Sequence, residues 1–403
     1  MKHRVLVTGL GIVSCMGLNL KAFWDEIKKG RSGIKPFDLP IEGTKMSVAA
    51  TVKGFNPEKY FSAKELSFLE RCSQFAIVAA REAISDAGLV IGERPLMNAA
   101  SIVGCAGAGQ ETFDEASYRL YKEHRSRVHP LSVPKGMACS VISQVSIHLR
   151  IKGPAFLIST ACASGAHALI QGVSMIQSGM VDVALVGGTE TPFNYVQLKS
   201  WDALRIVSND TCRPFSKDRS GMVLGEGAGM LVLESEEHAK KRNANIYAEI
   251  SGYGMTSDAG HMTRPDVSSV ANAMKNTLRN AGINADEVDY INAHGTGTLV
   301  NDIAETKAIH KAFGDHAKKL TISSTKSMHG HALGATSALE LVATTLALKN
   351  SVIPPTANFT VADEQCDLDY VPNDARKQNI NTALSNSFAF GGLNAVVALN
   401  KHA

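Results

Sequence analysis

Short apolar runs alternate with longer alanine-rich runs along the whole chain. The short runs predict strands at residues 4–8, 100–103, 155–159, 183–186, 229–233, 248–254, 290–293, 320–323, 382–385 and 395–400. The longer runs predict helices at residues 63–87, 165–178, 268–281, 302–313 and 334–349. This alternation predicts an α/β fold whose sheets are largely buried.

One strand–turn–helix pattern occurs twice. FLIST is followed by ACASGAHALIQGVSMI, and LTISST is followed by KSMHGHALGATSALELV. Each copy is a strand, a short turn rich in Gly and Ser, and an alanine-rich helix. Two copies of one α/β unit would explain the 403 residues as a single two-lobed body. A charged run at residues 236–245 closes the first half of the chain, so we expect halves at residues 1–246 and 247–403.

The first apolar run, VLVTGLGIVS at residues 5–14, is open to three interpretations. Basic residues precede it, as in an export signal, but Thr8, Gly9 and Gly11 would interrupt an export helix. A dinucleotide-binding fingerprint would need a third glycine and a later acidic residue at the end of a second strand. Both are missing, so we expect a buried strand that ends in a glycine-permitted turn.

Composition and charge exclude several classes of protein. The chain is 44 % hydrophobic and 20 % charged, which is unlike a disordered, coiled-coil or collagen-like chain. The net charge of +3 is too small to imply nucleic acid as the main partner. No apolar run approaches the roughly 20 residues that span a bilayer. The seven cysteines are scattered without a CxxC pair, so we expect no disulfide framework, no metal site and a reducing, cytoplasmic setting.

Cys162 lies in STACASG, between an apolar strand and a helix. Backbone N–H groups at the start of a helix carry partial positive charge, which favours a thiolate over a thiol. We therefore expect the pKa of Cys162 to be lowered. On this segment alone, a nucleophile and a small buried cysteine are equally good interpretations.

Two histidines favour the nucleophile. His294 ends a strand in NAHGTGT, and His331 lies in STKSMHGHALGA, the second-half counterpart of the cysteine turn. Nearby His329 and His167 are better explained as structural. With Cys162, the two post-strand histidines form a set of one nucleophile and two donors. Metal binding is the weaker interpretation, because no two histidines are spaced to share one helix face.

Four motifs in order then resemble the β-ketoacyl-[acyl-carrier-protein] synthases, specifically the elongating type. They are STACASG, NAHGTGT with Asp302, STKSMHGH with Glu340, and NSFAFGG. The resemblance covers essentially the whole chain. It implies the thiolase fold, an α/β architecture of five layers, α-β-α-β-α, from two similar halves. It implies no separate cofactor, because the substrates are carried on phosphopantetheine.

The same resemblance implies roles for individual residues. Cys162 would be acylated, with His294 and His331 as the catalytic pair. Lys326 would support the site together with Glu340 and Asp302. A surface ion pair with Glu340 is the alternative for that lysine, but its place five residues before His331 favours the supporting role. The remaining implied roles are the oxyanion-site and gate residue Phe390 and the pantetheine contacts Thr296 and Thr298.

Residue types also separate this chain from relatives with other activities. Chain-initiating synthases usually pair the cysteine with His and Asn, and chain-length factors replace the nucleophile. A degradative thiolase would need a second catalytic cysteine in place of NSFAFGG. The implied reaction is a decarboxylative Claisen condensation with malonyl-acyl-carrier-protein. The implied partners are an acyl carrier protein and a second subunit, identical or related.

Departures from the housekeeping fatty-acid pattern bear on the pathway. Gly107 stands where a bulky aliphatic residue is usual, and Ser132 where an aromatic one is usual, so we expect a wider and more polar acyl pocket. HGTGTLVND resembles type II polyketide ketosynthases. Lys64 and Arg205 match contacts to the carrier protein, although Ser67 and Phe68 replace basic residues. These features favour a polyketide or polyene pathway over housekeeping fatty-acid elongation.

Overall fold

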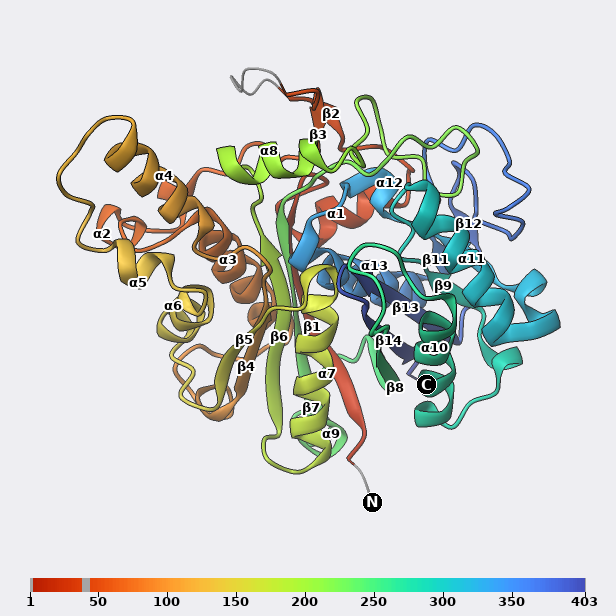
Figure 1. Ribbon diagram of the computed structural model, residues 1–403. Coiled ribbons are helices and arrows are strands. Elements are labelled where there is room, and N and C mark those ends of the chain that lie inside the picture. The colour runs from red at the N-terminus through yellow and green to blue at the C-terminus, as the bar shows by residue number, and fades with distance from the viewer. Residues whose placement is uncertain (1–2, 38–43, 403) are drawn as a thin grey trace.

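Ten strands of the computed structural model, which describes residues 3–37 and 44–402, form one hydrogen-bonded series (Figure 1). The order is β10-β9-β13-β14-β8-β1-β7-β6-β4-β5. The series joins at its middle through a short antiparallel pairing of Val5–Val7 with Ala248–Ile250. The bounds are β1 (Val5–Ser14), β4 (Ala100–Gly104), β5 (Ala155–Ile158), β6 (Val183–Glu190), β7 (Gly227–Ser235), β8 (Ala248–Ser257), β9 (Tyr290–Asn292), β10 (Thr321–Ser323), β13 (Thr382–Ala389) and β14 (Leu393–Asn400).

The two sides of this series have the same topology. In the first half, β4 pairs in parallel with β5 and β6, and β6, β7 and β1 follow in antiparallel order. In the second half, β9 pairs in parallel with β10 and β13, and β13, β14 and β8 follow in antiparallel order. The repeat expected from the sequence is therefore confirmed as a repeat of fold.

Each repeat contributes five strands of this series, and these form one of two sheets. Helices cover both sheets and fill the space between them, which gives five layers (Figure 1). The central layer holds α7 (Ser164–Gln177), packed on β4 and β6, and α13 (Thr336–Asn350), packed on β7 and β13. The outer layers hold α3 (Arg71–Asp86) with α6 (Ser140–Leu149), and α10 (Val267–Ala281) with α11 (Leu299–Phe313). Every residue of α13 from Thr336 to Leu348 is buried, as expected for a helix between two sheets.

Several elements differ from the sequence-based expectation. The helix predicted at residues 63–87 is two helices, α2 (Ala63–Leu66) and α3. The break falls before α3 because Glu70 is extended there, and its carboxylate accepts hydrogen bonds from Gly109 N and Thr112 N. The further elements are α1 (Leu20–Ile27), α4 (Gln110–Tyr121), α5 (Ser132–Gly136), α8 (Tyr195–Ala203), α9 (Glu236–Lys241), α12 (Lys326–His329), β2 (Lys35–Pro36), β3 (Val48–Ala49), β11 (Val352–Ile353) and β12 (Arg376–Lys377). Within residues 3–37 and 44–402, no helix has the length and apolar character that a bilayer crossing requires.

Gly9 and Gly11 do not form the expected turn, because both lie inside β1. A Cβ atom added to Gly9 would lie 2.2 Å from Ala83 O, and one added to Gly11 would lie 1.9 Å from Ala79 O. The glycines therefore let α3 pack directly on the strand backbone. In the same contact, Glu82 of α3 accepts a hydrogen bond of 2.9 Å from Ile12 N.

Candidate active site

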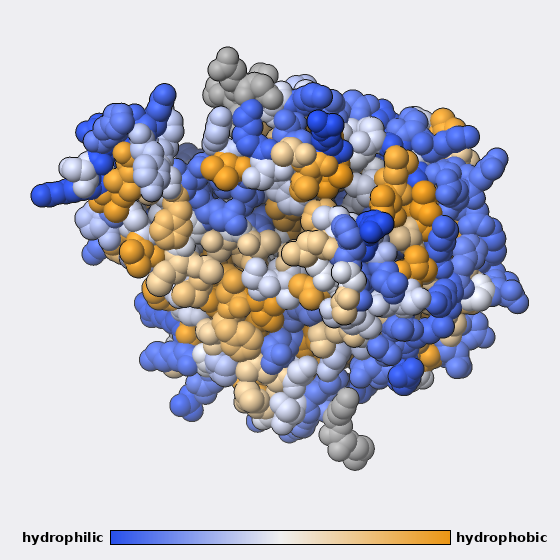
Figure 2. Space-filling model, viewed as in Figure 1, coloured by the Kyte–Doolittle hydropathy of each residue, from blue (hydrophilic) through white to orange (hydrophobic). Residues whose placement is uncertain are grey.

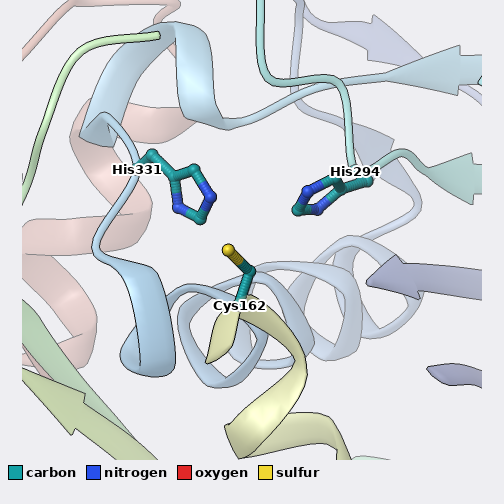
Figure 3. Close-up of side chains that lie close together, drawn as sticks. All are labelled: Cys162, His294 and His331. Carbon is teal, nitrogen blue, oxygen red and sulfur yellow. The ribbon is translucent and has the colours of Figure 1, made fainter. Parts of the chain in front are cut away.

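Three turns, each following a strand or a helix, bring the side chains of Cys162, His294 and His331 together (Figure 3). Cys162 lies in a 3-10 turn, Ala161–Ala163, between β5 and α7. His294 follows β9, and His331 follows α12. The Cys162 Sγ and one ring nitrogen of each histidine lie within 4.8 Å of one another, and all three residues are buried. The sequence-predicted nucleophile and donors therefore share one site.

The cysteine turn and the second-half turn have the same unusual backbone. Each is a 3-10 turn that leads into a central helix, Ala161–Ala163 before α7 and Leu333–Ala335 before α13. The first residue of each turn has a positive φ, 47° for Ala161 and 43° for Leu333. This conformation costs a non-glycine residue roughly 1–2 kcal/mol. Such strain is concentrated at functional sites, and here it occurs at corresponding places in both halves.

The ionisation of Cys162 differs from the expectation. Burial raises the pKa of the thiol to about 11, while the Lys326 charge and the N–H groups of Phe390 and Cys162 act in the opposite direction. The predicted lowering was wrong, because desolvation of a thiolate outweighs the field at the start of a helix. At neutral pH the group is a thiol, so its attack on a thioester needs a proton acceptor.

Two neutral imidazoles lie beside this thiol. Burial lowers the pKa of His294 and of His331 well below the usual value, and the Lys326 charge lowers both further. Leu333 N donates to His331 Nδ1 at 3.2 Å, and Thr336 Oγ1 lies 2.8 Å from the same nitrogen. An Nδ1 that accepts leaves the ring proton on Nε2. His331 can therefore donate an Nε2–H to a ligand in the site.

Lys326 is fully buried, so the alternative of a surface ion pair was wrong. Its Nζ lies 2.5 Å from Glu340 Oε1 and 2.5 Å from the backbone oxygen of His294. Burial raises the pKa of Glu340 to about 7, and the Lys326 charge opposes that rise. This pair fastens α12 to α13 and holds the loop that carries His294.

Two buried carboxylates that the sequence reasoning missed also shape the site. Glu190, at the end of β6, accepts hydrogen bonds from Ala106 N at 2.8 Å and Gly334 N at 3.1 Å. Glu305 accepts from His294 N at 2.9 Å and from Gly295 N. Both had a usable signal: Glu190 ends an apolar strand, and Glu305 lies one helical turn after Asp302.

A cavity of about 370 Å³ leads to the nucleophile. Of the sequence-predicted residues, it is lined by Cys162, His294, His331, Thr296, Thr298, Phe390 and Arg205. The hydroxyl oxygens of Thr296 and Thr298 lie 2.9 Å apart. The cavity therefore places a pair of hydroxyl groups and two cationic side chains, Arg205 and Arg264, along the way to Cys162.

The other predicted residues lie outside this lining. Asp302 is buried, accepts from Phe215 N at 2.8 Å and lies 3.7 Å from Arg219 Nε, so it fixes the loop behind Thr298. Lys64 is exposed on α2, and Ser132 is the buried first residue of α5. Asp302 therefore acts on the cavity only through the loop that it holds.

The expected open space at Gly107 is filled. A Cβ atom there would lie 2.6 Å from Gln197 Nε2 and 3.0 Å from Glu190 Oε1. Gln197 is itself held by a hydrogen bond to Gln110. The prediction of a wider pocket from Gly107 alone was therefore wrong, and the neighbourhood is polar because two amide side chains occupy it.

We expect Gly107→Ala to lower the rate of condensation about three- to tenfold for short and long acyl chains alike, because Gln197 must shift. The measurement is turnover with a series of acyl thioesters. The control is the double variant Gly107→Ala, Gln197→Ala. It removes the clash between the new Cβ and Gln197 Nε2, which would lie 2.6 Å apart, so turnover should recover. A loss confined to long chains would instead support an open acyl pocket at Gly107.

The Cys162, His294 and His331 atoms could also hold a thiophilic cation. One sulfur and two imidazole nitrogens are suitable ligands for Zn²⁺. A cation in that position would occupy the thiol and both ring donors at once.

Two family models match the chain. "Beta-ketoacyl synthase, N-terminal domain" covers residues 2–239, and "Beta-ketoacyl synthase, C-terminal domain" covers residues 247–360. Nodulation protein E of Rhizobium sp. (strain N33) is 46 % identical over 403 residues, with 100 % of both chains covered. The 3-oxoacyl-[acyl-carrier-protein] synthase 2 of Coxiella burnetii is 43 % identical over 411 residues, with 99 % of each chain covered.

Two solved structures extend the comparison. The ishigamide ketosynthase/chain length factor superposes with a TM-score of 0.95 at 35 % identity. A type II polyketide acyl-carrier protein in complex with its ketosynthase bound to the hexaketide superposes with a TM-score of 0.91 at 34 % identity. In both cases 100 % of each chain is covered. The fold is therefore that of ketosynthases of the thiolase type.

Proposed function

The chain belongs to the β-ketoacyl synthase family, and from this premise we propose that Cys162 carries the acyl group while His294 and His331 stabilise the enolate of malonyl-acyl-carrier-protein. The chain is a β-ketoacyl-[acyl-carrier-protein] synthase, and its reaction is a ketosynthase condensation. The observation that carries the assignment of roles is the approach of one thiol and two neutral imidazoles to within 4.8 Å at the end of a cavity.

In the first step, Cys162 Sγ attacks the thioester carbonyl of the acyl-carrier protein. The thiol proton passes to an adjacent neutral imidazole, and then to the pantetheine sulfur as the C–S bond breaks. The N–H groups of Cys162 and Phe390, which already face the sulfur, would receive the oxyanion. The product is an acyl thioester on Cys162.

In the second step, a malonyl thioester loses CO₂, and the electron pair forms an enolate. His331 Nε2–H, and an N–H of His294, would donate to the enolate oxygen. The enolate carbon then attacks the acyl-Cys162 carbonyl, and the cysteine sulfur leaves as a thiolate that takes up a proton from solvent water. Each well-placed donor contributes roughly 2.7–4 kcal/mol to such a transition state. Burial, together with the Lys326 charge, keeps both imidazoles neutral, so that each ring has one nitrogen that can accept a proton and one N–H that can donate.

The test follows the acyl group. Incubation with octanoyl-acyl-carrier protein should add one octanoyl group to Cys162, observed by intact mass and peptide mapping. Malonyl-acyl-carrier protein should then release CO₂ and give a β-ketoacyl product two carbons longer. Absence of the adduct would support a non-catalytic chain-length partner. An adduct formed only from a coenzyme A thioester, without CO₂ release, would support a degradative thiolase.

For the pathway, we propose a specialised type II polyketide or polyene elongation. The motif HGTGTLVND at residues 294–302, which resembles type II polyketide ketosynthases, supports this, as does the 34 % identity to the ketosynthase of a type II polyketide complex. The Rhizobium relatives are named for nodulation, which also points away from housekeeping metabolism. Housekeeping fatty-acid elongation by the same chemistry is the alternative. Single-turnover condensation with a panel of carrier proteins distinguishes the two pathways.

For its partners, we propose an acyl carrier protein and a second ketosynthase subunit, identical or related. Arg205, exposed at the cavity, offers a charge for an acidic carrier protein. β5 ends the sheet with one edge unpaired among the described strands, and Figure 2 shows apolar surface over the region of α6 and β5. Val133 and Ile147, on α5 and α6, are two-thirds exposed. A second sheet edge can pair with β5 and cover these side chains.

We expect a dimer at micromolar concentration by sedimentation velocity. Ile147→Glu should shift the protein to monomer, because a charge would be buried in the covered surface. Val90→Glu, an equally polar change at another exposed position, is the control and should leave the dimer intact. A stable monomer of the unmodified chain that retains full activity would contradict the expectation.

A further inference from the structure

Phe390 lies at the tip of the β13–β14 hairpin, and the backbone of that tip is firmly held. Gly391 N donates to Met262 O at 2.8 Å, and Asp258 N donates to Gly392 O at 3.0 Å. Gly391 and Gly392 both have positive φ, at 82° and 71°. The backbone on the C-terminal side of Phe390 is therefore anchored to the 258–262 segment.

The side chain of Phe390 has a different neighbour. The Trp201 ring lies with its centroid 6.1 Å from that of Phe390, at an interplanar angle of 29°. Both rings line the cavity that contains Cys162. Trp201 comes from α8, on the first half of the chain, so the contact links the two halves across the cavity.

Trp201 rests on a small apolar cluster of its own. That cluster includes Leu198 of α8, Met222, and Leu333 in the strained turn after His331. Leu198, Met222 and Leu333 are all buried. The Trp201 ring, which contacts Phe390, therefore belongs to the same apolar cluster as Leu333, whose backbone N–H fixes the His331 tautomer.

The backbone and the side chain of Phe390 therefore contact different parts of the site. Its backbone N–H faces the Cys162 sulfur, and its ring meets Trp201. Cys162 and Phe390 line the same cavity, so an acyl chain that extends from the sulfur into this cavity meets the Phe390 ring. Displacing that ring breaks the Trp201 contact.

We infer that Trp201 is a positioning residue for the Phe390 gate, holding the ring in the resting enzyme and releasing it when a long acyl chain occupies Cys162. The inference rests on the proposed function, in which Cys162 is acylated. An aromatic pair of this kind shifts a two-state equilibrium by about two- to tenfold. Trp201 therefore sets how easily long acyl chains load, and has little effect on short ones, which leave the gate in place.

The first test uses fluorescence. The chain has two tryptophans, Trp24 and Trp201, so Trp24→Phe leaves Trp201 as the only tryptophan. Octanoyl-acyl-carrier protein is added, acylation of Cys162 is confirmed by intact mass, and emission is compared before and after. We expect acylation to change the Trp201 emission. With Phe390→Leu added, the resting emission should already resemble that of the acylated state, and acylation should change it little.

The possible outcomes separate the explanations. No emission change on a confirmed octanoyl adduct overturns the inference while leaving the proposed function intact. An equal change with and without Phe390→Leu also overturns it, because the acyl chain itself would then contact Trp201. Absence of any adduct overturns the proposed function, and the gate role of Phe390 with it.

A kinetic test adds a readout that a merely structural role would not produce. Trp201→Leu should raise the rate of octanoylation of Cys162 two- to tenfold. Acetylation of Cys162 by acetyl-acyl-carrier protein should stay within twofold. Leu198→Ala, a change in the same cluster that leaves the Trp201 ring present, is the control for general loosening. Equal slowing of both acylations by Trp201→Leu would show that the tryptophan only supports the fold.

Discussion

Cys162→Ala should lower condensation by about 10³-fold or more, because Cys162 is the only thiol among the described residues that line the cavity. Some decarboxylation of malonyl-acyl-carrier protein should survive, since His294 and His331 remain to stabilise the enolate. The two reactions are measured separately, as CO₂ release and as β-ketoacyl product by mass spectrometry. The expected result is loss of product with retained CO₂ release.

The control for this experiment is Cys366→Ala, which removes another buried thiol that does not line the cavity. It should leave both reactions unchanged. Wild-type condensation by Cys162→Ala would rule out the nucleophile. Loss of both reactions together, with the variant still folded, would show that the sulfur takes part in decarboxylation as well.

His331→Ala should reduce condensation about 10²–10³-fold by removing one donor to the enolate oxygen. Acylation of Cys162 should still occur, so the protein stalls as an acyl-enzyme that intact mass detects. His294→Ala should behave in the same way. Single-turnover acylation and the later carbon–carbon step are followed on the same sample.

Thr336→Val provides a graded comparison, because it removes only the hydroxyl 2.8 Å from His331 Nδ1. The Leu333 N–H still fixes the tautomer, so we expect a loss of about tenfold. If His331→Ala and His294→Ala both elongate at the normal rate, the two-histidine enolate site is wrong.

The positions of the site residues were largely accessible from the sequence. Cys162 and His294 each follow a short apolar strand, and His331 occupies the second copy of the repeat. Because β4, β5 and β6 are parallel in one half and β9, β10 and β13 in the other, the ends of these strands meet at the centre. The local spacing and the repeat were therefore enough to predict that these three side chains lie close together.

Properties that depend on packing between distant segments could not be predicted from the sequence. The pKa of Cys162 follows from burial, which no local motif reports. The space at Gly107 is taken by Gln197, 90 positions later in the chain. The break before α3 depends on where the Glu70 carboxylate finds donors, at Gly109 and Thr112. In each case a tertiary contact determined the outcome and overrode the local sequence pattern.

The central layer has a consequence for how the protein unfolds. Gly165 of α7 has no room for a Cβ atom against Ser337 Oγ and Ala338 of α13, at 2.9 and 3.0 Å, so the two helices touch backbone to side chain. Each is apolar on the face that its own sheet cannot cover. In a half-length fragment, one central helix would expose an apolar face to water, and its sheet would be covered only in part. The two repeats are thus copies in sequence and topology but not independent folding units, and heat or urea should melt them in a single cooperative transition.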